Sequence, residues 1–288
     1  MFTTAERRAL DQLSTNGGRL AVVAADQRTK LREARDGAGL PSDDATLLDV
    51  KLDLVRALAP HAPAMLLDPE IGLPGAIDSG AFPARTGLIV SLERSGAIRT
   101  REGLRRAELL PEVGATGVRR LGGTAAKLLV RLRPDREDGD GENGRILRTA
   151  VADCAAHDLL LVVEALVYRL DDEDEAAFRA ARAGLIRGAA ELAEACGARY
   201  LKLEYPGDRA ACEAVTGALG VPWALLSAGV DHETFAGQLR DALAGGACGF
   251  IAGRSIWKES VVMDAGGRRA FLAGEARRRL SELLALVG

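Results

Sequence analysis

Two lysines interrupt apolar runs of the sequence, where a charged side chain is unusual. Lys202 lies within Tyr200–Tyr205 and Lys127 within Ala125–Leu132. An ammonium is costly to bury unless it is paired or neutral, so a lysine in such a run points either to a reactive amine or to a structural ion pair. Burial and a neighbouring cation can lower the pKa of a lysine from its usual value of about 10.4, which makes the amine a nucleophile toward carbonyl groups. The structural alternative is an ion pair of Lys202 with Glu164 or Asp26.

Carboxylates stand near the carboxyl ends of other apolar runs. Asp26 ends the first run, Asp68 ends the second and Glu164 lies in the fifth. Successive side chains of a strand point to opposite faces, so in Tyr200–Glu204 the leucines share one face and Lys202 has the other. Leucines suit the face that packs on helices, and Lys202 is therefore predicted to point inward. For Lys127 the pattern leaves the direction open.

Two turns of small residues follow the last two apolar runs. They read Ser227-Ala228-Gly229 and Ala252-Gly253-Arg254. Small residues let backbone amides approach an anion, and an arginine adds a charge-assisted pair of hydrogen bonds. We expect a phosphate site here, although two ordinary tight turns with a surface arginine would look the same.

These residues need a scaffold that gathers the carboxyl ends of many strands. Short runs of apolar residues alternate with stretches of helical period, as in parallel α/β proteins. Eight strands in one chain of 288 residues predict a (β/α)8 barrel (TIM barrel) spanning residues 1–288 as one domain, preceded by an extra N-terminal helix. An open doubly wound sheet is the rival, but its glycine-rich turn after the first strand is missing. The predicted strands are Leu20–Ala25, Ala64–Asp68, Thr86–Leu92, Ala125–Leu132, Leu159–Leu166, Tyr200–Tyr205, Trp223–Ser227 and Cys248–Gly253.

Composition excludes several classes of protein. The formal net charge is −3, which gives no general attraction for nucleic acid. No run approaches the roughly 18 apolar residues that cross a bilayer, and the four cysteines are scattered, as in a reducing cytoplasm. With three histidines, of which only His232 follows a strand, we expect no metal and no other cofactor. Oligomeric state is not encoded visibly, although homo-oligomers are common among soluble enzymes.

Seven segments, in order over residues 17–260, resemble the class I tagatose 1,6-bisphosphate aldolases and the related sulfofructose-phosphate aldolases. The resemblance is carried by Ala25-Asp26-Gln27-Arg28, Leu66-Leu67-Asp68-Pro69-Glu70-Ile71-Gly72-Leu73-Pro74, Lys127-Leu128-Leu129, Val163-Glu164, Leu201-Lys202-Leu203-Glu204, Leu226-Ser227-Ala228-Gly229-Val230 and Ala252-Gly253-Arg254-Ser255-Ile256-Trp257. No single segment is specific, but the ordered set is.

The resemblance implies how these residues would work. Lys202 would form an imine with a ketose phosphate, Glu164 would move the proton during carbon–carbon cleavage, and Lys127 would be the second lysine of the site. Dihydroxyacetone phosphate would be one product. Asp26 and Gln27 would meet substrate hydroxyls, and the phosphate site would comprise Ser227, Gly229, Gly253 and Arg254. Arg28 and Asp68 complete the predicted substrate-binding set.

The resemblance leaves the distal end of the substrate open between phosphate and sulfonate. A sulfonate carries one charge and a phosphate nearly two, so the basic residues of the distal pocket would differ. The candidates are Arg28, Arg131, Arg133 and Arg169. Two other functions share the same barrel: a sugar-phosphate isomerase or epimerase that uses Glu164 and Asp26 for proton transfer, and a non-catalytic sugar-phosphate-binding regulator.

Overall fold

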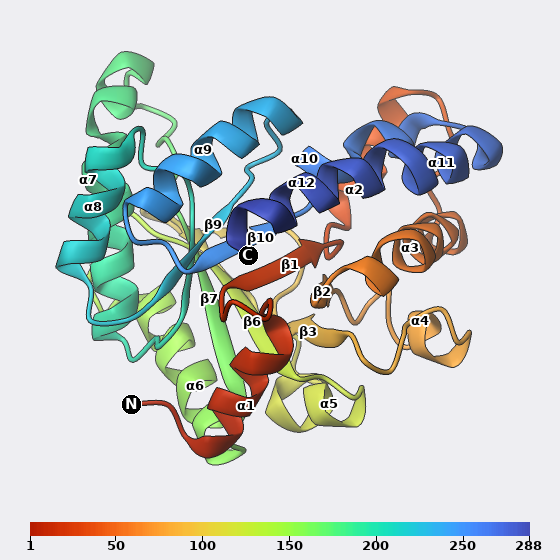
Figure 1. Cartoon of the computed structure of the whole chain (residues 1–288). Coiled ribbons are helices and arrows are strands. Elements are labelled where there is room, and N and C mark those ends of the chain that lie inside the picture. The colour runs from red at the N-terminus through yellow and green to blue at the C-terminus, as the bar shows by residue number, and fades with distance from the viewer.

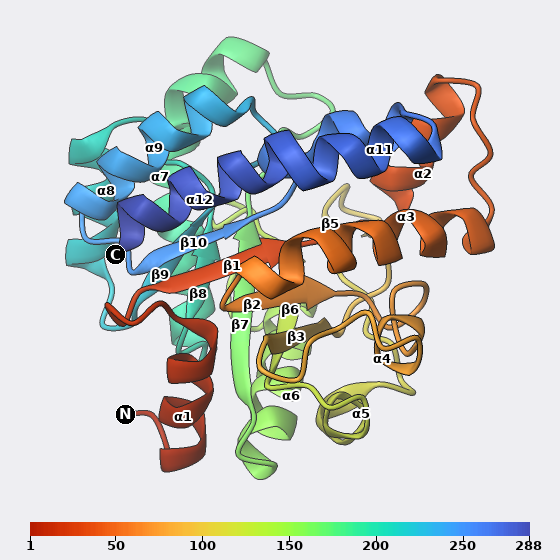
Figure 2. The same ribbon diagram turned by 45° about the vertical axis from the view of Figure 1, so that its right-hand side comes forward.

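The computed structural model describes all residues from Met1 to Gly288. Eight parallel strands close into a barrel in the order β1-β10-β9-β8-β7-β6-β3-β2, as Figures 1 and 2 show. The predicted barrel is confirmed, and each predicted strand end lies within two residues of the observed one. The strands are β1 (Leu20–Ala24), β2 (Ala64–Leu67), β3 (Gly87–Ser91), β6 (Ala125–Arg131), β7 (Leu160–Leu166), β8 (Leu201–Leu203), β9 (Trp223–Leu226) and β10 (Gly249–Ala252).

Helices connect the strands and cover the outside of the barrel (Figure 1). Several begin at an aspartate whose carboxylate accepts a backbone N–H of the first turn, which satisfies an amide that has no partner within the helix; Asp43, Asp174 and Asp208 do so. The helices are α2 (Thr29–Gly37), α3 (Asp44–Leu58), α4 (Gly75–Asp78), α5 (Gly114–Arg120), α6 (Glu142–Ala156), α7 (Glu175–Ala195), α8 (Arg209–Ala218), α9 (His232–Ala244), α10 (Arg254–Trp257), α11 (Ala265–Phe271) and α12 (Arg277–Val287).

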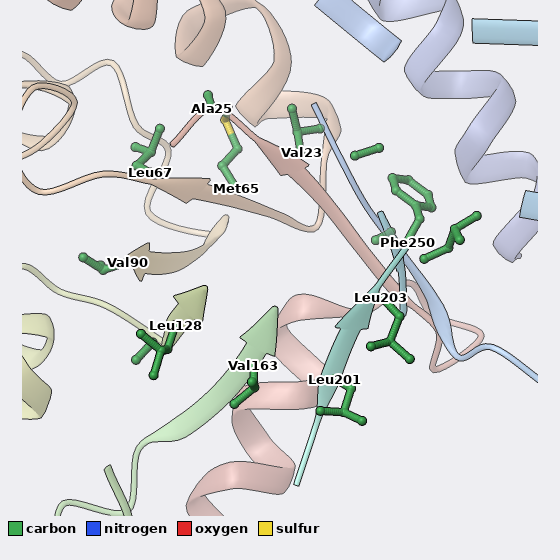
Figure 3. Packing of buried hydrophobic residues seen from close by; sticks show 14 of the residues in the cluster. Val23, Ala25, Met65, Leu67, Val90, Leu128, Val163, Leu201, Leu203 and Phe250 are labelled. Carbon is green, nitrogen blue, oxygen red and sulfur yellow. The ribbon is translucent and has the colours of Figure 1, made fainter. Parts of the chain in front are cut away.

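Alternation along the strands produces two separate apolar layers. In β1, Val22 and Ala24 belong to a small cluster inside the barrel, whereas Ala21 and Val23 belong to the large cluster between the barrel and its helices. Figure 3 shows part of this outer layer, with side chains from neighbouring strands side by side. The inner positions are therefore the ones that decide what the barrel mouth contains.

An additional helix, α1 (Thr4–Leu13), closes the amino end of the barrel. Thr3 and Glu6 form a reciprocal capping box at its start, and Ala9 and Leu13 extend the inner apolar cluster. Both views place this helix below the strands, apart from the surrounding ring. The predicted N-terminal helix is confirmed, and the inner cluster is sealed at that end.

The stretch Glu93–Pro111 follows β3, and its first residues, 93–96, lie at the mouth of the barrel. It contains a small antiparallel hairpin of β4 (Ile98–Arg99) and β5 (Arg105–Arg106), closed at its base by a bridge between Glu93 and Leu109. No helix of the structure is both long and apolar enough to cross a membrane.

Candidate active site

Charged side chains occupy the inner positions directly above the apolar layer. Glu164 follows Leu160 and Val162 on the inner face of β7, and Lys202 follows Tyr200 on that of β8. The register pairs Glu164 with Lys202 across these neighbouring strands. Lys127, whose direction the sequence left open, points inward from β6. Alternation of side chains therefore directs the acid and both lysines into the interior of the barrel.

Glu164 bridges the two lysines through one oxygen. Its Oε2 lies 2.8 Å from the Lys202 Nζ and 2.9 Å from the Lys127 Nζ. Glu164 is 7% exposed, Lys202 is 4% and Lys127 is 1%. Burial alone would raise the pKa of Glu164, but attraction to the two ammonium groups outweighs burial and lowers it. Glu164 is thus ionised and in contact with the nitrogen of Lys202, so it can accept a proton from it.

Lys127 stands at the centre of three carboxylates. Its Nζ lies 2.9 Å from Asp26 Oδ2, 2.6 Å from Glu93 Oε1 and 2.9 Å from Glu164 Oε2. Burial disfavours the ammonium, but Asp26, Glu164 and Glu93 together raise the pKa of Lys127 well above its usual value. Lys127 therefore stays protonated. In return it lowers the pKa of Asp26 against the effect of burial, with help from Lys202.

Glu93 is a site residue that the sequence analysis missed. It lies just beyond the carboxyl end of β3, is 4% exposed, and accepts the Leu129 N–H at 3.0 Å as well as the Lys127 ammonium. Burial raises its pKa, and the negative charge of Asp26 adds to the effect, against the attraction of Lys127. A signal existed in the sequence, because Ile89, Ser91 and Glu93 alternate on one face in continuation of the strand.

Gln27 and Arg28 extend the site from the end of β1. The Gln27 amide donates to Asp26 Oδ1 at 3.1 Å, and its own Oε1 is buried without a hydrogen-bond partner. Arg28 donates to the Glu70 carboxylate and, at 2.9 Å, to the Glu93 carbonyl. Its Nε is buried without a partner. Each of the two residues thus holds one buried polar atom that no protein group satisfies.

Two adjoining cavities open on either side of Lys202. The larger, of about 290 Å³, is lined by Lys127, Asp26, Glu93 and Arg131 among others. The smaller, of about 190 Å³, reaches the turns after β9 and β10. Both are lined by Lys202 and by Gln27, Glu164, Leu166 and Arg254. The lysine amine therefore lies where a chain spanning both cavities would present its middle.

The turns after β9 and β10 form the wall of the smaller cavity. Gly229 has a φ of +85°, and a side-chain carbon there would lie 2.9 Å from the Arg254 guanidinium carbon. A carbon on Gly253 would lie 2.3 Å from the Ala24 carbonyl oxygen. Glycine suits Gly229 because side chains rarely adopt this positive φ, and it suits Gly253 because the absent side chain lets the backbone of β1 come this close. Arg254 Nη2 donates to the Ala228 carbonyl at 3.2 Å, and Ser227 lies at the same wall.

Asp68, which was predicted to bind substrate, lies behind the site instead of lining either cavity. Its side chain is fully buried and forms an ion pair with Lys51 of α3, with 2.5 Å between Oδ1 and Nζ. Its other oxygen accepts the Ile71 N–H at 2.7 Å. Asp68 therefore has no surface to offer a ligand in this structure.

The arginines considered for the distal anion divide into two groups. Arg28 and Arg131 line the larger cavity. All five N–H groups of Arg133 are used by Asp135, Glu173 and the Tyr168 carbonyl, and Arg169 lines neither cavity and donates to backbone carbonyls of its own loop. Only Arg28 and Arg131 of this set can meet a ligand in the site.

The profile of the DeoC/LacD family aldolases matches residues 20–259. This span includes all eight barrel strands and every charged residue of the mouth described above. The chain belongs to the DeoC/LacD family of aldolases.

Two relatives of this DeoC/LacD aldolase are also named as aldolases. Tagatose 1,6-diphosphate aldolase 2 of Enterococcus faecalis is 28% identical over 312 residues, covering 98% of this chain and 93% of that protein. Tagatose 1,6-diphosphate aldolase of Listeria monocytogenes is also 28% identical, covering 88% and 81%. A solved Schiff-base-forming fructose-1,6-bisphosphate aldolase superimposes with a TM-score of 0.64 at 18% identity, covering 98% and 99%, which shows the shared fold.

As an aldolase the protein is a lyase that makes or breaks a carbon–carbon bond. A retro-aldol reaction needs an acceptor for the electron pair of the broken bond and a base for a hydroxyl proton. The mouth of this DeoC/LacD aldolase holds a lysine amine and an ionised carboxylate in direct contact, which are groups suited to those two tasks.

Proposed function

We propose that the protein is a class I aldolase that reversibly cleaves a ketose 1-phosphate to dihydroxyacetone phosphate and a three-carbon aldehyde, through an imine on Lys202. The substrate is of the tagatose 1,6-bisphosphate or 6-deoxy-6-sulfofructose 1-phosphate type. The single observation that carries the proposal is the contact of Glu164 with both lysines at the junction of two cavities.

Formation of the imine follows from that contact. Glu164 takes a proton from the Lys202 ammonium, 2.8 Å away, and the neutral amine attacks the ketone carbon of the substrate. Glu164 then gives this proton to the carbinolamine hydroxyl, which leaves as water, so that a protonated imine remains and Glu164 is ionised again. Lys127 keeps its own charge because three carboxylates surround it, so it stabilises Glu164 electrostatically and does not compete as the nucleophile.

Bond cleavage uses the same two groups. The electron pair of the bond between the third and fourth carbons moves toward the imine nitrogen and forms an enamine. The hydroxyl on the fourth carbon gives its proton to Glu164 and becomes the aldehyde. Glu164 returns the proton to the third carbon, and water then hydrolyses the imine to release dihydroxyacetone phosphate. Asp26 and Gln27, at the edge of the larger cavity, are placed to orient the substrate hydroxyls.

Each of the two cavities contains basic residues that can bind one end of the substrate. The 1-phosphate fits the smaller cavity, where Ser227, Gly253 and Arg254 form the wall and Gly229 lies against the Arg254 guanidinium. The distal anion fits the larger cavity, which is lined by Arg28 and Arg131. The names of the two relatives favour a second phosphate at the distal end. Rates measured side by side with tagatose 1,6-bisphosphate and the sulfonated ketose 1-phosphate would decide between the two.

Borohydride trapping tests the chemistry directly. The protein is incubated with dihydroxyacetone phosphate, reduced, digested and examined by peptide mass spectrometry, with Lys202→Met as the control. We expect an adduct on Lys202 in the wild type, none in the variant, and complete loss of cleavage in the variant while dihydroxyacetone phosphate still binds. An adduct on Lys127 would exchange the roles of the lysines, and no adduct despite bound ligand would refute the imine mechanism.

A further inference from the structure

We infer that Lys51 of α3 is a positioning residue for the reaction, because its ammonium fixes the backbone on both sides of Asp26. Lys51 touches no part of either cavity, and it acts through the segment that carries Asp26 and Gln27. The inference rests on the proposed function, in which these two residues orient the substrate.

The ammonium of Lys51 is buried and lies close to three oxygen atoms, although the residue belongs to an outer helix. Its side chain is 1% exposed, and its Nζ lies 2.5 Å from Asp68 Oδ1. The same nitrogen donates to the Ala25 carbonyl at 2.5 Å and to the Gln27 carbonyl at 2.9 Å. Two N–H donors of the ammonium are thus used by backbone carbonyls, and the carboxylate of Asp68 balances its charge at ion-pair distance.

The two carbonyls flank the residue that matters for the site. The Ala25 N–H still bonds to Leu66 of β2, at 2.8 Å, and after it the chain leaves the strand to form the mouth of the barrel. There Lys51 supplies the donor for the carbonyls on either side of Asp26. The carboxylate of Asp26 is thereby directed at Lys127, with 2.9 Å between Oδ2 and Nζ, and its Oδ1 receives the Gln27 amide.

Asp68 holds the ammonium in that position. One oxygen of Asp68 pairs with Lys51, and the other accepts hydrogen bonds from the backbone N–H groups of Ile71 and Gly72. These backbone contacts hold Asp68 itself in a fixed position. A buried ion pair often contributes little net stability compared with apolar side chains of similar volume. We therefore expect the Lys51–Asp68 pair to matter mainly for the position of the segment after β1. A change in that position can be detected as a change in kcat.

The same helix offers a matched control. Asp53 of α3 pairs with Arg268 of α11 at 2.7 Å, and each side chain is 7% exposed. Neither residue lines a cavity of the site. Arg268→Met thus breaks a buried ion pair on α3 without touching the Asp26 segment, whereas Lys51→Met breaks one that holds it.

The experiment compares wild type, Lys51→Met and Arg268→Met by melting temperature, by borohydride trapping with dihydroxyacetone phosphate, and by kcat and KM for cleavage. Both variants are expected to melt at lower temperature. Lys51→Met should keep the Lys202 adduct, since the smaller cavity and Glu164 do not contact Lys51, but its kcat should fall about 10²-fold, with KM changing less, because small misplacements of a substrate-orienting group cost about that much. Arg268→Met should keep the wild-type kcat.

A second variant covers the case in which Lys51→Met does not fold. Lys51→Met combined with Asp68→Asn removes both buried charges, and the same fall in kcat is expected from it. A kcat within about twofold of that of Arg268→Met, in whichever variant folds, would overturn the inference and leave the proposed function intact. If the wild type itself gave no Lys202 adduct, the proposed function would fail, and the inference would fall with it.

Discussion

The ammonium of Lys127 can be removed with little change of shape by Lys127→Met. Three carboxylates, those of Asp26, Glu93 and Glu164, lie within 2.9 Å of its nitrogen. After the substitution, Lys202 is the one ammonium left in contact with any of these carboxylates inside the barrel mouth, and Lys51 and Arg28 act on them from farther away. We expect the variant to be destabilised by roughly 3–5 kcal/mol at pH 7, the usual cost of leaving a buried charge without its partner.

The protein can relieve this cost by binding protons, which gives the effect a characteristic pH dependence. In the wild type the folded-state pKa values of Asp26 and Glu164 are lowered, so their contribution to stability is present above the unfolded value of about 4 and is lost as the pH falls through the lower folded value. Without Lys127 the folded-state pKa values should rise above about 4. The variant should then lose stability as the pH increases, by about 1.4 kcal/mol per pH unit for each extra proton that the folded state binds.

Urea unfolding at pH 5, 6 and 7, followed by far-UV circular dichroism, measures both quantities. The difference in unfolding free energy between wild type and Lys127→Met should widen across this range. Adding Glu93→Gln to the variant removes one of the three negative charges and should recover part of the loss. A difference that stays below about 1 kcal/mol and does not depend on pH would refute the description of Lys127 as the cation that balances the site.

Three other changes test separate parts of the site. Glu164→Gln should lower kcat by about 10²–10⁴-fold in a steady-state cleavage assay, and a fall smaller than tenfold would remove Glu164 as the proton acceptor. Arg254→Ala should raise KM roughly tenfold or more, as expected for a lost charge-assisted hydrogen bond to phosphate; an unchanged KM would place the phosphate elsewhere. Cleavage should persist in EDTA, because the imine itself draws the electrons of the broken bond, and a loss that a divalent cation reverses would contradict that route.

The barrel and much of its charged mouth could be predicted from the sequence because alternation along strands is a strong constraint. Lys202 interrupts leucines that share the outer face, and its inward direction followed directly. For Lys127 the neighbours on its face were Ala125 and Leu129, which suit either side, so only the closed sheet decides its direction.

Other residues depend on contacts that sequence spacing does not contain. Glu93 follows β3 by two positions, but the charged stretch after it hid the continuation of the alternating pattern. Lys51 lies four residues after the buried Leu47 and three before the buried Leu54, a spacing that places it on the inner face of α3. Its partners Asp68, Ala25 and Gln27 come from two strand ends, and no local pattern predicts that they meet. Arg133 could only be set aside once Asp135 and Glu173 were seen to use its donors.

The helix α1 also limits the route by which products can depart. Because Ala9 and Leu13 complete the apolar interior at the amino end of the strands, no polar route leads out through that end, and both fragments must leave by the mouth where the substrate entered. Under the proposed imine mechanism, the dihydroxyacetone phosphate half stays attached to Lys202 until water arrives, so the aldehyde departs first. Steady-state kinetics of the cleavage reaction should accordingly follow an ordered release. In the synthetic direction, the same geometry lets the enzyme load one ketose phosphate fragment and then accept whichever aldehyde fits the larger cavity.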